Sequence, residues 1–199
     1  MAGETLRRCN AAVQENGGAV RGRVVQAHLR WVETYGNTAD VDAVLLELRR
    51  SGGSLRFTDD DWIPFRVLLG IDRTIASRFS SSGSADDVME DVGRYVGRSL
   101  FPAPLREWTN DDRHAFLCEL ASAEHDLVDF AQPAYEAAAQ TKGVIRRASS
   151  RVHDRLHCAA LTGFYEQALL LRGALRPTVS EEICQSLGWP ACKFLLRWR

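Results

Sequence analysis

Apolar residues recur at helical spacing along the first part of the chain, which predicts a run of helices. Residues 20–36 carry two adjacent apolar stripes, and Gly36 stands where a left-handed helix end is expected. A second helix is predicted from Thr38, as its N-cap, up to the Gly52-Gly53 pair.

Three further helices are predicted before residue 131. One begins at the acidic run 59–61, whose carboxylates favour the positive end of a helix dipole, and runs to about Phe79. Another spans about 85–100 and presents valines and a tyrosine on one face. The third runs from Asn110, as its cap, to about Phe130.

The pattern changes after residue 130. A Lys142-Gly143 turn between two short segments indicates a hairpin, and residues 151–172 form a strongly apolar helix. Residues 192–198 alternate at strand period after a turn signal at 187–190, which indicates a second hairpin.

These elements predict the α+β class. The helical N-terminal half, 18–130, precedes a smaller antiparallel sheet packed by one long helix, 131–199. We expect a single domain over 18–199, preceded by a flexible N-terminus at 1–17.

Composition narrows the function classes. Hydrophobic residues make up 45% of the chain and charged residues 26%, as in ordinary soluble proteins. Lys+Arg number 25 against 26 Asp+Glu, so nothing argues for nucleic acid, and the Arg146-Arg147 pair is interpreted as solvated charge. No apolar run approaches the ~18 residues of a membrane span and no signal peptide is evident, so a cytoplasmic location is expected.

Catalytic motifs are absent from the sequence. It contains no GxSxG elbow, no GxxxxGK[ST] phosphate loop and no GxGxxG after a predicted strand. Cys118 lies in the apolar stretch AFLCEL and is expected in the core. We therefore expect a protein that is not an enzyme.

The strongest chemical signal is a set of three thiols and one carboxylate near the end of the chain. A hairpin turning at 188–190 would bring Cys184 and Cys192 side by side, with Cys158 approaching from the preceding helix. Glu181 could join them only if the backbone kinks or its carboxylate swings round. Four protein donors are the number in a closed tetrahedral zinc site, which indicates structural rather than catalytic zinc.

Other interpretations of these residues stay open. Buried cysteines often act only as small apolar side chains, and Cys184 and Cys192 could instead form a disulfide across the hairpin. His153 and His157, four residues apart beside Cys158, could face the same metal.

The C-terminal region resembles a known small-molecule-binding domain. GVIRRASSRVHDRLHCAALTGFYEQALLL and VSEEICQSLGWPACKFLLRW are similar to 4-vinyl reductase-type domains, particularly the sensor domains of phenol-responsive regulators. In that family a helix cysteine and a Glu-x2-Cys-x7-Cys hairpin hold structural Zn²⁺. The resemblance places the ligands at Cys158, Glu181, Cys184 and Cys192.

The N-terminal half is similar to an uncharacterised paralogous family abundant in myxobacteria, through VRGRVVQAHLRWVETYG, DWIPFRVLLGIDRTIA and GRYVGRSLF. The fold implied by both resemblances is also that of haem-nitric-oxide-binding domains and vesicle-tethering adaptors. It is a helical cap over a small twisted antiparallel sheet, enclosing an apolar pocket and commonly dimerising.

The resemblances imply a non-enzymatic zinc-containing sensor domain that binds a small apolar or aromatic ligand and signals through a separate, unknown protein partner. A homodimer is expected, and Trp108 and His114 are candidate ligand contacts. No haem is expected, because no supporting tyrosine-serine-arginine motif is present. The alternatives are a protein-interaction adaptor of the vesicle-tethering type and an enzyme related to vinyl reductases.

Overall fold

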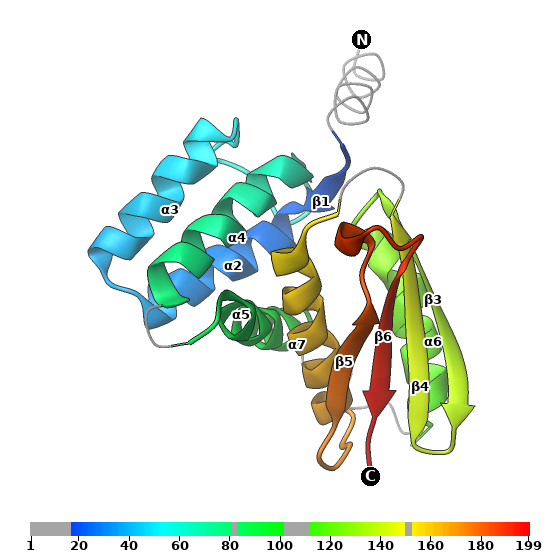
Figure 1. Cartoon of the computed structure of the whole chain (residues 1–199). Coiled ribbons are helices and arrows are strands. Elements are labelled where there is room, and N and C mark those ends of the chain that lie inside the picture. The colour runs from blue at the N-terminus through cyan, green and yellow to red at the C-terminus, as the bar shows by residue number, and fades with distance from the viewer. Residues whose placement is uncertain (1–16, 81–82, 102–111, 150–152) are drawn as a thin grey trace.

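A long helix, α7 (Arg155–Leu171), lies between a layer of helices and a four-stranded antiparallel sheet (Figure 1). The computed structural model describes residues 17–80, 83–101, 112–149 and 153–199. Most of the predicted flexible N-terminus falls outside these residues. The predicted α+β class is confirmed.

The helical layer is built from four amphipathic helices whose buried faces meet in one core. They are α2 (Gly22–Tyr35), α3 (Thr38–Arg50), α4 (Phe65–Phe79) and α5 (Ala85–Leu100). A two-stranded ribbon of β1 (Ala19–Arg21) and β2 (Trp62–Pro64) closes one end of this layer. Among the described residues, no helix has both the length and the apolar character that crossing a bilayer requires.

Two predicted helix starts in this layer are wrong by a few residues. The N-cap of α3 is Asn37 rather than Thr38, because Asn37 and Asp40 exchange side-chain-to-backbone hydrogen bonds in a capping box. Helix α4 begins at Phe65 rather than near the acidic run, because Trp62–Pro64 pair with β1 as a strand.

The fifth predicted helix is shorter than expected. Its predicted cap, Asn110, lies outside the described residues, and α6 (Arg113–Ala123) is capped by Asp112. A single 3₁₀ turn, η3 (Glu124–Asp126), follows, and the chain then enters the sheet.

The sheet has the order β3-β4-β6-β5 and is antiparallel throughout. Its strands are β3 (Ala131–Ala139), β4 (Lys142–Ser149), β5 (Thr178–Ile183) and β6 (Cys192–Arg197). The first hairpin turns at Gln140 and Thr141, because Lys142 and Gly143 already belong to β4.

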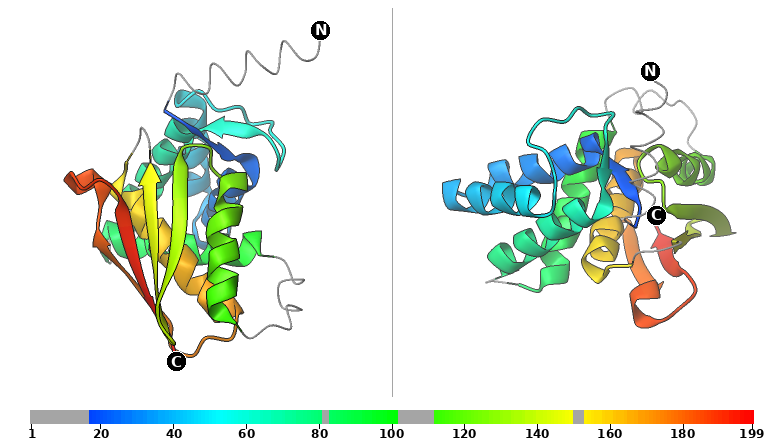
Figure 2. Two further views of the ribbon diagram at one scale, coloured as in Figure 1. Left: turned by 90° about the vertical axis from the view of Figure 1, so that its right-hand side faces the viewer. Right: turned by 90° about the horizontal axis from the view of Figure 1, so that it is seen from above.

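One face of the sheet packs on α7, whose turns lie behind the strands when the sheet is viewed face-on (Figure 2). Ile145 and Phe194 are opposite one another on this inner face, and both are fully buried. The Phe194 ring lies 5.3 Å from that of Tyr165 on α7. Strand alternation thus assigns each residue to the inner or outer face.

Helices α5 and α7 touch backbone to backbone. A Cβ atom added at Gly163 would lie 1.8 Å from the carbonyl oxygen of Glu90, and one at Gly93 would lie 1.8 Å from that of Ala160. Such distances are far inside van der Waals contact, so only glycine allows this approach.

Replacing Gly163 with alanine should therefore destabilise the fold. Alanine by itself favours a helix interior by about 1 kcal/mol. Forcing α5 and α7 apart should outweigh this and lower the free energy of unfolding by about 2 kcal/mol or more. Urea unfolding of Gly163→Ala measures the effect.

Gly83→Ala is the matched control, because a Cβ there would meet nothing closer than 3.7 Å. Equal stability of Gly163→Ala and Gly83→Ala would show that the contact between the two helices is not tight.

Candidate metal centre and adjoining cavity

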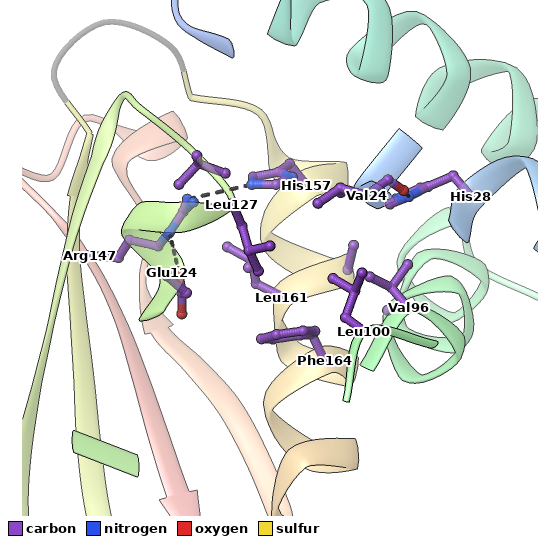
Figure 3. A pocket seen from close by; sticks show the side chains of 13 residues that line it. Val24, His28, Val96, Leu100, Glu124, Leu127, Arg147, His157, Leu161 and Phe164 are labelled. Atoms are coloured by element: carbon purple, nitrogen blue, oxygen red, sulfur yellow. Dashed lines mark hydrogen bonds and ion pairs between the residues drawn. The ribbon is translucent and has the colours of Figure 1, made fainter. Parts of the chain in front are cut away.

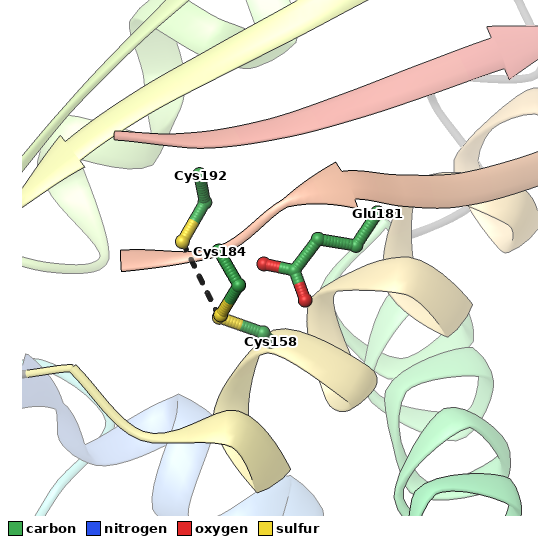
Figure 4. A group of neighbouring side chains, drawn as sticks. All are labelled: Cys158, Glu181, Cys184 and Cys192. Carbon is green, nitrogen blue, oxygen red and sulfur yellow. Dashed lines mark hydrogen bonds between the residues drawn. The ribbon is translucent and has the colours of Figure 1, made fainter. Parts of the chain in front are cut away.

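The structure brings together the four predicted zinc ligands. Cys158, Glu181, Cys184 and Cys192 each offer one donor atom, and these atoms all lie within 4.8 Å of one another (Figure 4). The three cysteines are buried and Glu181 is half-buried. Their role as metal ligands remains a prediction.

Local backbone features explain the convergence. The pairing of β5 with β6 shifts register between Glu181 and Ile183, and this bulge supplies the kink that Glu181 needs. Gly188 adopts a left-handed conformation, with φ at 91°, and turns the chain back toward β6. Cys158 belongs to the first turns of α7, which Asp154 caps through the Leu156 amide.

The spacing of the sulfurs suits coordination better than a disulfide. The Cys158 Sγ lies 3.5 Å from that of Cys192 and 3.7 Å from that of Cys184. Two thiolates on a tetrahedral zinc at about 2.3 Å would be about 3.8 Å apart, whereas a disulfide bond measures about 2.05 Å. All three thiols are free, so the disulfide alternative is not what the structure forms.

The surroundings of the cluster favour a cation at its centre. Oε1 of Glu181 is buried without a hydrogen-bond partner, which is costly unless a cation or proton compensates it. The Gln185 backbone amide donates to the Cys192 sulfur at 3.3 Å, and the Ser186 hydroxyl lies 2.9 Å from the Cys184 sulfur. Such donors can share the excess negative charge of three thiolates and a carboxylate.

Hydrogen bonding and burial shift the pKa values of the three thiols in different directions. The hydrogen bond to Cys192, together with burial, raises the pKa of Cys158 far above its ordinary value. The same hydrogen bond lowers the pKa of Cys192, and burial raises the pKa of Cys184. A bound divalent ion would replace the shared protons.

Neither alternative histidine joins the cluster. His157 is buried, and its Nε2 lies 3.5 Å from an Arg147 nitrogen instead. His153 is exposed. Cys118, expected in the core, is also exposed, because α6 buries Phe116, Leu117 and Leu120 on its other side.

A small cavity of about 50 Å³ adjoins α7 (Figure 3). Apolar side chains from α2, α5, α7 and the segment after η3 make most of its wall, among them Val24, Val96, Leu100, Leu127, Leu161 and Phe164. The candidate contact Trp108 lies outside the described residues. His114 does not line this cavity, because its ring is hydrogen-bonded to Tyr135 and to the carbonyl of Gln140.

One end of the cavity holds a buried ion pair that the sequence analysis missed. Arg147, interpreted as solvated, is only 4% exposed and lies 3.2 Å from the Glu124 carboxylate. The Tyr165 hydroxyl donates to the same carboxylate. Burial raises the pKa of Glu124, and Arg147 opposes that shift. Strand alternation could have indicated this burial, because Arg147 lies two residues after Ile145 on β4 and so projects from the same inner face.

A second buried pair joins α2 to α4. His28 lines the cavity, donates from Nδ1 to the Val24 carbonyl at 2.8 Å, and has Nε2 3.4 Å from Asp72. Burial lowers the pKa of His28 to about 4 and raises that of Asp72 well above its usual range. Burial thus favours the neutral form of both side chains.

Comparison with known proteins shows the fold. No protein-family model and no curated relative matches the sequence. Among solved structures, an H-NOX protein from S. oneidensis in the Fe(II)NO state matches with a TM-score of 0.64 and 15% identity, over 90% of this chain and 99% of that one. An oxygen-binding H-NOX domain related to soluble guanylate cyclases matches with a TM-score of 0.63 and 17% identity, over 90% and 95%.

The chain therefore has the fold of H-NOX domains, as expected from the predicted kinship with haem-nitric-oxide-binding domains. The finer resemblance to zinc-containing 4-vinyl reductase-type sensors stays a prediction. Another matched H-NOX structure, at 15% identity, concerns haem distortion in that family. Such a likeness shows the fold alone, and the expectation that this chain binds no haem stays a prediction.

The described residues do not fit haem as they stand. Pockets that bind small molecules and cofactors, such as haem, measure about 300–1,000 Å³. The cavity beside α7 offers about 50 Å³ and is closed at one end by the Glu124–Arg147 pair. We derive no function through haem. Whether the purified protein carries haem is decided by its visible absorption spectrum.

Metal removal should destabilise the protein. We expect about one zinc per chain by elemental analysis, and a chelator should lower the melting temperature. For a site that is about 1,000-fold saturated, the loss corresponds to about 4 kcal/mol.

Cys184→Ser should lose zinc and become insensitive to chelator, whereas Cys118→Ser should behave like the parent protein. Parent protein that purifies without metal, and whose melting temperature is changed neither by chelator nor by Cys184→Ser, would contradict the zinc assignment.

The His28–Asp72 pair should make stability fall as pH rises above neutrality. Between about pH 4 and 6.5, unfolding lets His28 bind a proton and makes Asp72 release one. These two changes have opposite effects on the pH dependence of stability and cancel. Above about pH 6.5 only the Asp72 difference remains, and its raised pKa makes stability fall as pH rises until folded Asp72 ionises.

Asp72→Asn carries no such proton and should flatten this slope. Urea unfolding from about pH 6.5 to about 8.5 gives both profiles. Parallel profiles would mean that Asp72 is ionised in the folded protein.

Proposed function

We propose that this chain is a non-enzymatic, zinc-stabilised sensor domain that binds a small apolar ligand in the cavity beside α7. The observation that carries the proposal is the cavity itself: a largely apolar space with a buried ion pair at one end. Binding sites for small molecules commonly combine an apolar wall with a few fixed polar groups. The H-NOX fold of the neighbours is consistent with such a role.

The size of the cavity limits the ligand. A single water needs about 10–15 Å³, and an apolar cavity of about 150 Å³ is known to hold benzene. At about 50 Å³ the cavity exceeds an ordinary packing void but is too small for an aromatic ring. A ligand of a few heavy atoms fits directly, and an aromatic ligand requires movement of the wall.

The zinc would act structurally in this proposal. Four protein donors fill a tetrahedral shell and leave no position for a substrate. The ion would fix the β5–β6 hairpin to α7 through Cys158, Cys184 and Cys192. We further propose a homodimer that signals through a separate protein partner, and native mass spectrometry of the purified protein tests the dimer.

Variants of Leu161 test the cavity. Leu161→Ala enlarges the space, costs about 2–5 kcal/mol, and should create room for benzene. Benzene should then raise the melting temperature of this variant more than that of the parent protein. Leu161→Phe should fill the space and abolish binding of xenon, which the parent protein is expected to take up.

Leu170→Ala is the control, because Leu170 is exposed on the same helix. The proposal fails if xenon and benzene do not discriminate between the Leu161 variants and this control. If the protein is instead an adaptor without a ligand, the Leu161 variants and Leu170→Ala should take up xenon and benzene alike, and all should bind the same protein partner equally.

A further inference from the structure

A basic groove of about 640 Å³ lies at the end of the sheet where β6 finishes, near the chain end marked C in Figure 1. Four cationic residues line it: Lys142, Arg176, Arg197 and Arg199. Within the described part of the chain, none of the four takes part in an ion pair, although the whole sequence has a net charge of only -1. The groove thus gathers unpaired positive charge that the overall composition conceals.

Strand register forces two of these charges together. Lys142 on β4 and Thr178 on β5 both pair directly with Arg197 on the central strand β6. Residues opposite one another in antiparallel strands project from the same face, with Cβ atoms about 4.5–5.5 Å apart. Like charges at such positions destabilise a sheet unless a counter-charge lies between them.

The backbone beside Arg176 is held in an uncommon conformation. Arg176 has φ at 48°, the one positive value for a non-glycine residue in the described chain. Two backbone hydrogen bonds between Leu175 and Arg199, of 3.0 and 2.9 Å, fix this segment against the end of β6. A left-handed arginine costs about 1–2 kcal/mol, and such strain persists where the surrounding structure imposes it.

The carboxylates of Glu136 and Glu182 on this face of the sheet pair with Arg146 and Lys193, and not with the four cations of the groove. The pKa of Glu182 is lowered first by its hydrogen bond to Lys193 and further by the positive charges of Lys142 and Arg197. Glu182 is committed to Lys193, with an N–O distance of 2.6 Å. The other polar side chains lining the groove are the hydroxyls of Thr141 and Thr178.

We infer that this groove binds a multiply charged oxyanion of the phosphate type, carried by a soluble metabolite or by a lipid headgroup. Arginine offers a planar fork of donors that matches phosphate oxygens, and lysine adds a point charge. An anion between Lys142 and Arg197 removes their mutual repulsion. The site is separate from both the cysteine cluster and the cavity beside α7.

Pyrophosphate is the probe, and its binding is measured by calorimetry at low ionic strength, where screening is weak. The double variant Lys142→Gln/Arg197→Gln should bind at least about tenfold more weakly, the loss of two charge-assisted contacts. The matched control is Arg49→Gln/Arg50→Gln. It removes the same charge from two exposed residues in the last turn of α3, which do not line the groove, and should bind within about twofold of the parent protein.

Stability provides a second readout. In buffer without multivalent anions, Lys142→Gln/Arg197→Gln should melt no lower than the parent protein, because it removes opposed like charges. Pyrophosphate should raise the melting temperature of the parent protein and not that of this variant.

Vesicles distinguish the two sources of phosphate. Binding to phosphatidylcholine vesicles that contain a phosphatidylinositol phosphate, but not to phosphatidylcholine alone, would assign a lipid headgroup. Binding of pyrophosphate without vesicle binding would assign a soluble ligand. The inference is overturned if neither probe binds saturably, or if both double variants weaken binding equally.

Discussion

The contact between α5 and α7 is the constraint on which the remaining architecture depends. Gly93 and Gly163 let the two backbones meet, so α7 sits deep between the helical layer and the sheet. Because α7 is buried along nearly its whole length, each of its faces packs against a different part of the protein. One face meets α5 and the cavity, and another meets the strands that carry the cysteine cluster.

The cysteine cluster and the cavity are neighbours through two short connections. His157 and Cys158 are adjacent on α7, and Arg147 pairs directly with Cys192 across β4 and β6. Arg147 and His157 also approach each other at the polar end of the cavity. Arg147 and His157 thus line the cavity and are also immediate neighbours of two of the proposed ligands.

The sequence predicted those features that depend on strong local patterns. Helical periodicity located the helices, and alternation around Cys192 located the final strand. The spacing of Glu181, Cys184 and Cys192 identified side chains that the fold does bring together. Cys158 was expected to approach from the preceding helix, and the resemblance to known sensor domains assigned all four residues to one ligand set.

Features set by tertiary pairing were not predicted. Trp62–Pro64 look like the start of a helix, and only their pairing with β1 makes them a strand. Arg147 looks solvated in sequence, but its strand position turns it inward toward Glu124. Cys118 looks buried, yet α6 contacts the rest of the protein with its other side. In each case the missing information is which element packs against the residue.

The central claim is that three sulfurs and one oxygen share one metal ion where α7 meets the terminal hairpin. X-ray absorption at the zinc edge of the purified protein tests it most directly. Zinc held by these four residues should show a first shell of three sulfurs at about 2.3 Å and one oxygen at about 2.0–2.2 Å. A shell made only of oxygen and nitrogen, or one with fewer than three sulfurs, would contradict it.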